Sequence, residues 1–231
     1  MKILITGATS GFGKAMAEKF ASEGNDLILT GRRAERLAEF AKELHEKFSV
    51  QVSTKVFDVQ NKEEVFNALS NDENLENVDV VVNNAGLALG RDFFDEASLD
   101  DWEVMIDTNV KGLLYVTKAM LPYLIKTGKG HIVNIGSTAG MEVYEKGNVY
   151  CATKHAVLAI SESLRAELSK KIRITTISRG SVNTPFIHQT KNKELLSKFK
   201  PSFESGMPVE WVASQIINAI EVEDGVNISE I

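Results

Sequence analysis

Tyr150 and Lys154 stand four residues apart in the segment "NVYCATKHA", which has the composition of a helix. Residues at this spacing share one helix face, so the phenol and the ammonium are expected to be neighbours. A phenol ionises near pH ~10 and needs no cationic partner at neutral pH. A proton donor works best with a pKa near the operating pH, and a nearby cation favours the phenolate. The pair therefore indicates an acid/base tyrosine activated by a lysine; a helix-face pair without chemistry is the alternative.

A glycine-rich segment follows the first apolar run of the chain. This segment, "TGATSGFG" at 6–13, leads directly into a helical pattern. Glycines in such a turn let backbone N–H groups approach a pyrophosphate at the positive end of the helix dipole. A turn that binds nothing is the alternative, but its place between the first strand and the first helix favours a dinucleotide site.

Two arginines, Arg32 and Arg33, follow the second apolar run, in "LTGRRAERL". In dinucleotide-binding folds an acidic residue near this point binds the ribose of NAD, whereas an arginine accommodates the 2′-phosphate of NADP. The planar guanidinium suits a phosphate, so we expect NADP; two solvated charges at a helix start are the alternative. Asp58 and Val59 close the third apolar run, where the carboxylate is expected either to accept from the adenine amino group or to cap the next helix.

These residues require elements that position them, and the chain alternates apolar runs with helical patterns. Strands are expected at 2–6, 26–30, 52–59, 78–86, 130–137, 172–178 and 226–231. Helices are expected at 12–23, 33–48, 61–70, 99–126, 149–169 and 208–221. This alternation predicts βαβ crossovers and an α/β fold with a parallel sheet covered on both faces.

Composition narrows the class of protein. The chain has 231 residues, 43% hydrophobic and 25% charged, with no linker-like stretch, so we expect one domain spanning 1–231. A net charge of -6 with scattered lysines and arginines argues against nucleic-acid binding.

The first apolar run is too short for a signal peptide, and no apolar run approaches the length of a membrane span. A single cysteine excludes an internal disulfide framework and suits the cytoplasm. Four scattered histidines argue against a metal site.

The motifs together resemble the short-chain dehydrogenase/reductase family. They are, in order, the glycine-rich turn 6–13, "NNAG" at 83–86, Ser137 and the Tyr150-X-X-X-Lys154 pair. Within the family, the segments 83–90, 102–115 and 130–140 are similar to the NADP-dependent serine and 3-hydroxy acid dehydrogenases. The resemblance implies a single-domain, doubly wound Rossmann fold with seven parallel strands, and hydride transfer between nicotinamide and a carbonyl or alcohol.

Four catalytic roles are implied by this resemblance. Tyr150 is the expected acid/base, and Lys154 is expected to hydrogen-bond the nicotinamide ribose as well as to activate the tyrosine. Ser137 is expected to donate to the substrate oxygen, and Asn109 to hold a water that links the lysine to solvent. The alternatives are that Ser137 only caps a turn and that Asn109 only occupies a helix bend.

The resemblance also implies a set of cofactor contacts. The expected contacts are Gly7, Thr9, Ser10, Gly11, Phe12, Gly13, Arg32, Arg33, Asp58, Val59, Asn83, Ala85, Gly86, Tyr150, Lys154, Gly180, Val182 and Thr184. Asn83 is also expected to stabilise the neighbouring strand ends.

The sequence departs from the family pattern near the substrate. Many relatives carry Pro-Gly after the sixth strand, whereas this chain reads Ser178-Arg179-Gly180. We expect Arg179 to point to solvent, the alternative being a contact with cofactor phosphates or an anionic substrate. The expected substrate lid, 184–206, does not follow the serine dehydrogenase pattern, and the loop 140–148 also differs.

The substrate is therefore expected to be a small hydroxy or oxo compound, a 3-hydroxy acid such as serine being one candidate. The alternatives are a reductase of larger carbonyls, such as oxoacyl thioesters, sugars or xenobiotic ketones, and a non-catalytic NADP-binding sensor. The intact set of four catalytic residues argues against the sensor.

A homodimer or homotetramer is expected, because the helices at 99–126 and 149–169 carry more apolar residues than one buried face needs. Family members commonly associate through these helices. The candidate contact residues are Leu113, Leu114, Val116, Met120, Val157, Leu158, Ile160 and Leu164.

Overall fold

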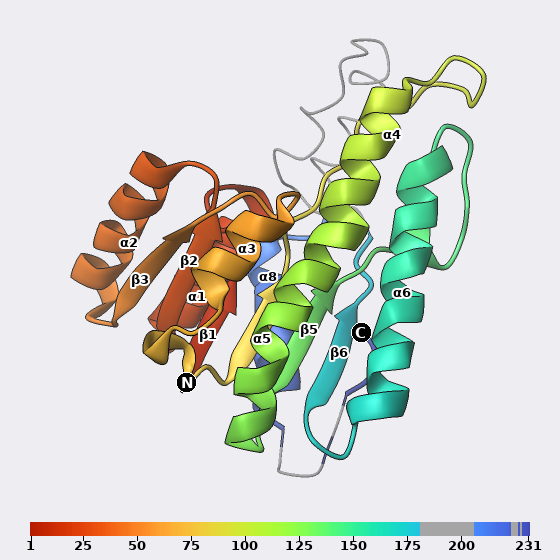
Figure 1. The fold of residues 1–231 in the computed structure, drawn as a ribbon. Coiled ribbons are helices and arrows are strands. Elements are labelled where there is room, and N and C mark those ends of the chain that lie inside the picture. Colours follow the sequence, from red (N-terminus) through yellow and green to blue (C-terminus); the bar gives the residue numbers. More distant parts are fainter. Residues whose placement is uncertain (181–205, 223–225, 227) are drawn as a thin grey trace.

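Six parallel strands form one sheet in the part of the chain that the computed structural model describes, residues 1–180, 206–222, 226 and 228–231. The strands are β1 (Lys2–Ile5), β2 (Asp26–Gly31), β3 (Val52–Val56), β4 (Val80–Asn83), β5 (His131–Ile135) and β6 (Arg173–Ile177). Their spatial order is β3-β2-β1-β4-β5-β6, and every neighbouring pair is parallel (Figure 1). The strand order reverses between β1 and β4, which in such sheets opens a crevice at the carboxyl ends of these strands. The predicted α/β fold is confirmed.

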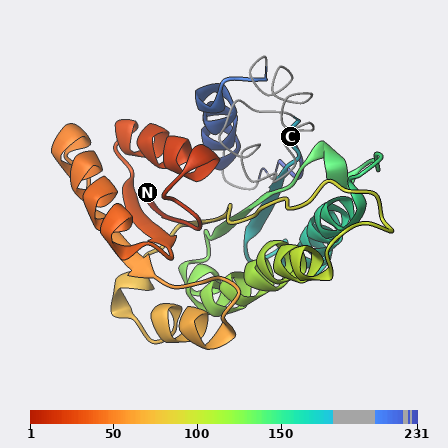
Figure 2. The same ribbon diagram turned by 90° about the horizontal axis from the view of Figure 1, so that it is seen from above.

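Helices cover both faces of the sheet (Figure 2). One face carries α1 (Gly11–Ser22), α2 (Ala34–Phe48) and α8 (Val209–Ile220), and the other carries α3 (Lys62–Leu69), α5 (Leu113–Thr127) and α6 (Asn148–Leu168). Successive side chains of a strand point to opposite faces, so Ile3 and Ile5 pack with α1, whereas Leu4 packs with α3 and α5. This double burial explains why the strands read as continuous apolar runs.

The helix expected at 99–126 consists of three consecutive pieces. They are α4 (Leu99–Ile106), a π-helical segment η2 (Asp107–Gly112) and α5. A π-helical turn often accompanies a functional side chain, and Asn109 lies within it. Close packing favours glycine at position 112, because a Cβ there would lie 2.9 Å from Val59 Cγ2.

The expected seventh strand, 226–231, is only partly present among the described residues. Glu230 forms a single parallel bridge with Thr176. Thr176 N donates to Ser229 O at 3.0 Å, and Ile231 N donates to Thr176 O at 3.0 Å. Within the described residues the sheet therefore has six strands and one bridge rather than the expected seven strands, because the pairing seen there is a single bridge.

A buried polar network joins the strand ends to the helices behind them. Asn83 Nδ2 donates to Thr117 Oγ1 and to Asn134 Oδ1, both at 2.9 Å, which ties β4 to α5 and β5. Asn134 Nδ2 donates to Ser161 Oγ at 2.9 Å on α6. The Asn134 amide bonds to both Asn83 and Ser161 and is fully buried, so it is the centre of this network.

Replacing Asn134 with alanine should lower the free energy of unfolding, measured by urea denaturation, by about 2–4 kcal/mol, because it leaves buried partners without their hydrogen bonds. The control is Ile132→Val on the same strand, which is equally buried and should cost only about 0.5–1.5 kcal/mol. A loss no larger than that of the control would show that the network does not stabilise the fold.

Candidate active site

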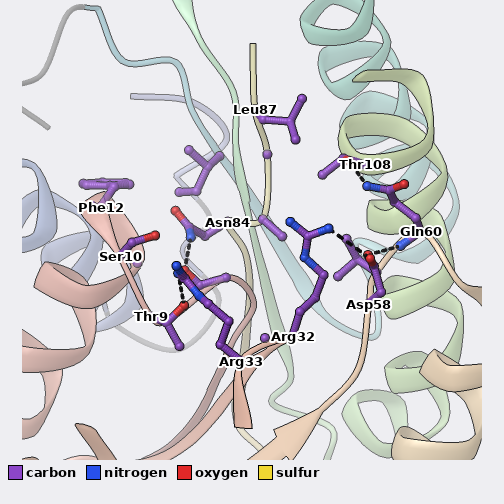
Figure 3. A pocket seen from close by; sticks show the side chains of 18 of the residues that line it. Thr9, Ser10, Phe12, Arg32, Arg33, Asp58, Gln60, Asn84, Leu87 and Thr108 are labelled. Atoms are coloured by element: carbon purple, nitrogen blue, oxygen red, sulfur yellow. Dashed lines mark hydrogen bonds and ion pairs between the residues drawn. The ribbon is translucent and has the colours of Figure 1, made fainter. Parts of the chain in front are cut away.

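A cleft of about 510 Å³ lies at the carboxyl ends of the strands, within the size range of small-molecule sites (Figure 3). The lining residues that the sequence analysis predicted are Gly7, Thr9, Ser10, Gly11, Phe12, Gly13, Arg32, Arg33, Asp58, Val59, Ala85, Gly86, Tyr150 and Lys154. The lining residues that it did not assign to the site are Gly31, Phe57, Gln60, Asn84, Leu87, Thr108 and Ile135. The signal that could have found them is adjacency, since each lies beside a predicted residue or at a strand end.

The glycine-rich turn wraps the start of α1. Gly7 has φ +66°, and a Cβ on Gly13 would lie 2.4 Å from Gly7 O, so both positions require glycine. Ser10, the N-cap residue of α1, makes no side-chain capping hydrogen bond, and the first turn carries no acidic side chain. The positive end of α1 is thus presented to the cleft in a form that fits a phosphate group.

Arg32 and Arg33 lie at the same end of the cleft, Arg33 beside Thr9 of the glycine-rich turn and Arg32 beside Asp58 (Figure 3). Arg32 Nη1 lies 3.1 Å from Asp58 Oδ2, and Arg33 Nη2 donates to Thr9 Oγ1 at 2.7 Å. Partial burial, followed by repulsion from Arg36 and Arg32, lowers the pKa of Arg33. The two guanidinium groups lie close enough to repel each other. A bound phosphate would offset this repulsion better than solvent alone.

Asp58 does not cap the following helix. Asn61 is the N-cap of α3, and its side chain accepts from the backbone N–H groups of Glu63 and Glu64. Asp58 instead bonds Arg32 and accepts from Gln60 N at 3.0 Å, so its carboxylate lies in the wall of the cleft.

The structure separates the two asparagines after β4. The buried Asn83 side chain points to Thr117 and Asn134 and does not line the cleft, although it was expected to contact the cofactor. Asn84 lines the cleft instead, and its Nδ2 donates to Thr6 O at 2.8 Å. Neighbouring strand residues point to opposite sides, and this alternation was the available signal.

Tyr150 and Lys154 lie on one face of α6 at the other end of the cleft. Both are nearly buried, and Lys154 Nζ lies 6.0 Å from the centre of the Tyr150 ring. Lys154 Nζ donates to Ile135 O at 2.8 Å, which ties α6 to the end of β5. Burial, followed by repulsion from Arg179, lowers the pKa of Lys154 to about 7.

Asn109 holds the loop after β4 against α6. Its Oδ1 accepts from Leu87 N at 2.9 Å, while its Nδ2 donates to Leu87 O at 2.8 Å and to Thr153 Oγ1 at 3.1 Å. These bonds place Leu87 in the cleft wall and agree with the alternative of a residue at a helix irregularity. The expected water link to Lys154 stays a prediction.

Ser137 is half-buried after β5 and is not among the residues that line the cleft. Its Oγ accepts from Ala139 N at 3.2 Å, as the N-cap of a short 3-10 helix, η3 (Thr138–Gly140). A hydroxyl that accepts a bond still has its own proton to donate, so this cap is compatible with a substrate contact.

The expected contacts after β6 are largely untested by the structure. Gly180 is described but does not line the cleft. Val182, Thr184 and all of the expected lid 184–206 except its last residue lie outside the described residues.

Arg179 lines the cleft, so the expectation that it points to solvent is wrong. Its Cζ lies 5.4 Å from the centre of the Phe12 ring, and its carbonyl accepts from Thr138 N at 3.1 Å. This backbone bond ties the segment after β6 to the start of η3. Burial lowers the pKa of Arg179, and the charge of Tyr150 opposes this shift.

Neither a metal site nor a membrane-spanning helix is found in the described ranges. Across these ranges no three His, Cys, Asp or Glu side chains gather as a metal site would require. Every helix there falls short of the length and apolar character needed to cross a bilayer.

Several known proteins are similar to this chain in sequence. The short chain dehydrogenase family model matches residues 1–195. The NADP-dependent 3-hydroxy acid dehydrogenase of Salmonella typhi is 47% identical over 186 residues, which cover 79% of this chain and 73% of that protein. Sulfoacetaldehyde reductase 2 of Chromohalobacter salexigens is 47% identical over 187 residues, covering 80% and 73%.

Solved structures of related dehydrogenases have the same fold as this chain. Serine dehydrogenase from Escherichia coli superposes with a TM-score of 0.84 at 38% identity, covering 100% of this chain and 96% of that one. A closed form of serine dehydrogenase complexed with NADP+ gives a TM-score of 0.89 at 39% identity, covering 100% and 94%. The matched length, the glycine-rich turn and the Tyr150–Lys154 pair lead to one conclusion: this chain belongs to the short-chain dehydrogenase family.

Proposed function

We propose that this chain is an NADP(H)-dependent oxidoreductase acting on a small hydroxy or oxo compound, with a 3-hydroxy acid such as serine as the leading candidate. The observation that carries the proposal is one cleft with arginines and a helix N-terminus at one end and a buried tyrosine–lysine pair at the other. The named activities of the relatives, a 3-hydroxy acid dehydrogenase, a sulfoacetaldehyde reductase and a serine dehydrogenase, support it.

The residues at the first end of the cleft fit the phosphates of NADP. The uncapped N-terminus of α1 and the turn 7–13 would bind the pyrophosphate, and Arg32 with Arg33 would bind the 2′-phosphate. Asp58 and Val59 would contact the adenine, and Ala85 with Gly86 the adenosine ribose and backbone. When bound, the nicotinamide supplies or accepts the hydride.

The residues at the second end would handle the proton. In reduction, Tyr150 gives its hydroxyl proton to the carbonyl oxygen, and in oxidation it takes the proton back from the alcohol. Ser137 donates a hydrogen bond to the same oxygen and holds it in place. Lys154, whose pKa is about 7, both places positive charge beside Tyr150 and exchanges protons near neutral pH.

The protein is also proposed to be cytoplasmic, because its single cysteine is buried and free; cell fractionation tests this location.

A homo-oligomer is proposed through α4, α5 and α6, with light scattering at micromolar protein as the test. Of the eight apolar residues considered, Leu113, Val116, Met120 and Val157 are buried in the chain's own core. Leu114 is 42% exposed and remains available. Leu114→Asp should therefore lower the mass to that of a monomer, whereas Val56→Asp on edge strand β3, 50% exposed, should not. A monomeric unmutated protein would refute this assembly.

Coenzyme preference is expected to depend on Arg32. Charge-assisted hydrogen bonds contribute about 1.5–3 kcal/mol each, so NADPH should bind at least about tenfold more tightly than NADH by titration calorimetry. Arg32→Ala should remove most of this preference. Arg36→Ala is the control, because Arg36 is exposed in the first turn of α2 and does not line the cleft. Equal affinity of the unmutated protein for both coenzymes would reject the NADP assignment.

Tyr150→Phe should lower turnover at least about 100-fold in a panel of hydroxy acids and carbonyls with NADP(H), because general acid–base catalysis contributes about 10²–10⁴-fold. NADPH affinity should change only a few-fold, since the substitution removes the hydroxyl and keeps the ring. Tyr115→Phe, on α5 outside the cleft, is the control. A Tyr150→Phe enzyme with most of its activity would end this mechanism, and a panel without any turnover would favour the sensor.

A further inference from the structure

Arg179 stands at the end of the cleft where the reaction is proposed to occur. It follows β6 by two residues, and its carbonyl is tied by Thr138 N to the loop that carries Ser137. Arg179 lines the cleft together with Tyr150 and Lys154, and its Cζ lies 5.4 Å from the Phe12 ring centre. The side chain is thus held between the start of α1 and the tyrosine–lysine pair.

The charges that line the cleft are strongly unbalanced. Its basic side chains are Arg32, Arg33, Lys154 and Arg179, whereas Asp58 is the one acidic side chain of the described lining. Asp58 lies with Arg32 at the opposite end, 3.1 Å from its guanidinium. At the Tyr150 end, the buried Lys154 and the half-buried Arg179 therefore line the same space. After burial, repulsion from Arg179 contributes to the lowered pKa of Lys154. Such an arrangement favours an anionic ligand.

The phosphates of the cofactor already have partners elsewhere in the cleft. The first turn of α1 and the pair Arg32 and Arg33 account for the pyrophosphate and the 2′-phosphate in the function proposed above. Arg179 instead neighbours Tyr150, which must touch the reacting oxygen. An anion beside Arg179 would then be a second group on the substrate, close to the carbon that is oxidised or reduced.

We propose that Arg179 is a specificity-determining residue that binds a carboxylate or sulfonate on the substrate, next to the hydroxyl or carbonyl that reacts. The planar guanidinium forms two parallel hydrogen bonds with such a group, and its partial burial strengthens them. The inference rests on the proposed function and narrows its substrate class to small anionic hydroxy or oxo compounds.

A pair of substrates that differ in charge tests the proposal. Oxidation of 3-hydroxypropionate and of its neutral methyl ester with NADP+ gives two values of kcat/KM, whose ratio measures the preference for the anion. Arg179→Gln should lower this ratio at least about tenfold, the usual weight of a charge-assisted hydrogen bond, and Arg179→Lys should give an intermediate ratio. Lys126→Gln is the control, because Lys126 is exposed and pairs with Glu76 outside the cleft. An unchanged ratio in Arg179→Gln would overturn the proposal.

Binding measurements separate this inference from the reaction itself. Malonate, a small unreactive dicarboxylate, is titrated into the NADP+-saturated protein by calorimetry, and Arg179→Gln should weaken its binding at least about tenfold. That result in a protein that turns over neither substrate would reject the proposed reaction and retain the anion site. Weaker NADPH binding with unchanged malonate binding would assign Arg179 to a cofactor phosphate and overturn the proposal. Absence of malonate binding by the unmutated protein would overturn it as well.

Discussion

The hydrogen bond from Lys154 Nζ to the carbonyl of Ile135 connects α6 to the end of β5, and the proposed chemistry depends on it. It holds a cation in a nearly buried position, where desolvation disfavours the charged form. Tyr150, one turn earlier on the same helix, also lines the cleft. The fit is tight, since a Cβ on Gly140 would lie 2.7 Å from Lys154 O. A cation confined in this way makes the reacting end of the cleft receptive to negative charge.

Buried amides keep that geometry in place from two sides. Asn109 ties the loop after β4 to η2 and α6, through Leu87 and Thr153. Asn134 ties β5 to α6 through Ser161. Buried polar groups are stable only when their partners are in position, so these networks specify one arrangement of helices and strands. Helix α6 is therefore positioned by hydrogen bonds as well as by apolar packing.

The cleft divides into two ends that come from different parts of the chain. Loops after β1, β2 and β3 supply the proposed phosphate-binding features, and α6 with the segment after β6 supplies the proposed acid/base pair and Arg179. The parallel order of the strands brings all of these carboxyl ends to one edge of the sheet. Positive charge at both ends suits a polyphosphate cofactor and an anionic substrate in the same cleft.

Local sequence determined the strand–helix alternation, the glycine-rich turn and the Tyr150–Lys154 pair, because periodicity and spacing within one element act over a few residues. Tertiary structure decided what depends on contacts between distant segments. Alternation along the chain indicates that Asn83 and Asn84 point to opposite sides, but only the packed sheet decides that Asn83 faces Thr117 and that Asn84 faces the cleft. The Arg179 carbonyl accepts from Thr138 N, 41 residues earlier in the numbering, and its side chain lies near the Phe12 ring at the cleft. Only folding brings those three segments together.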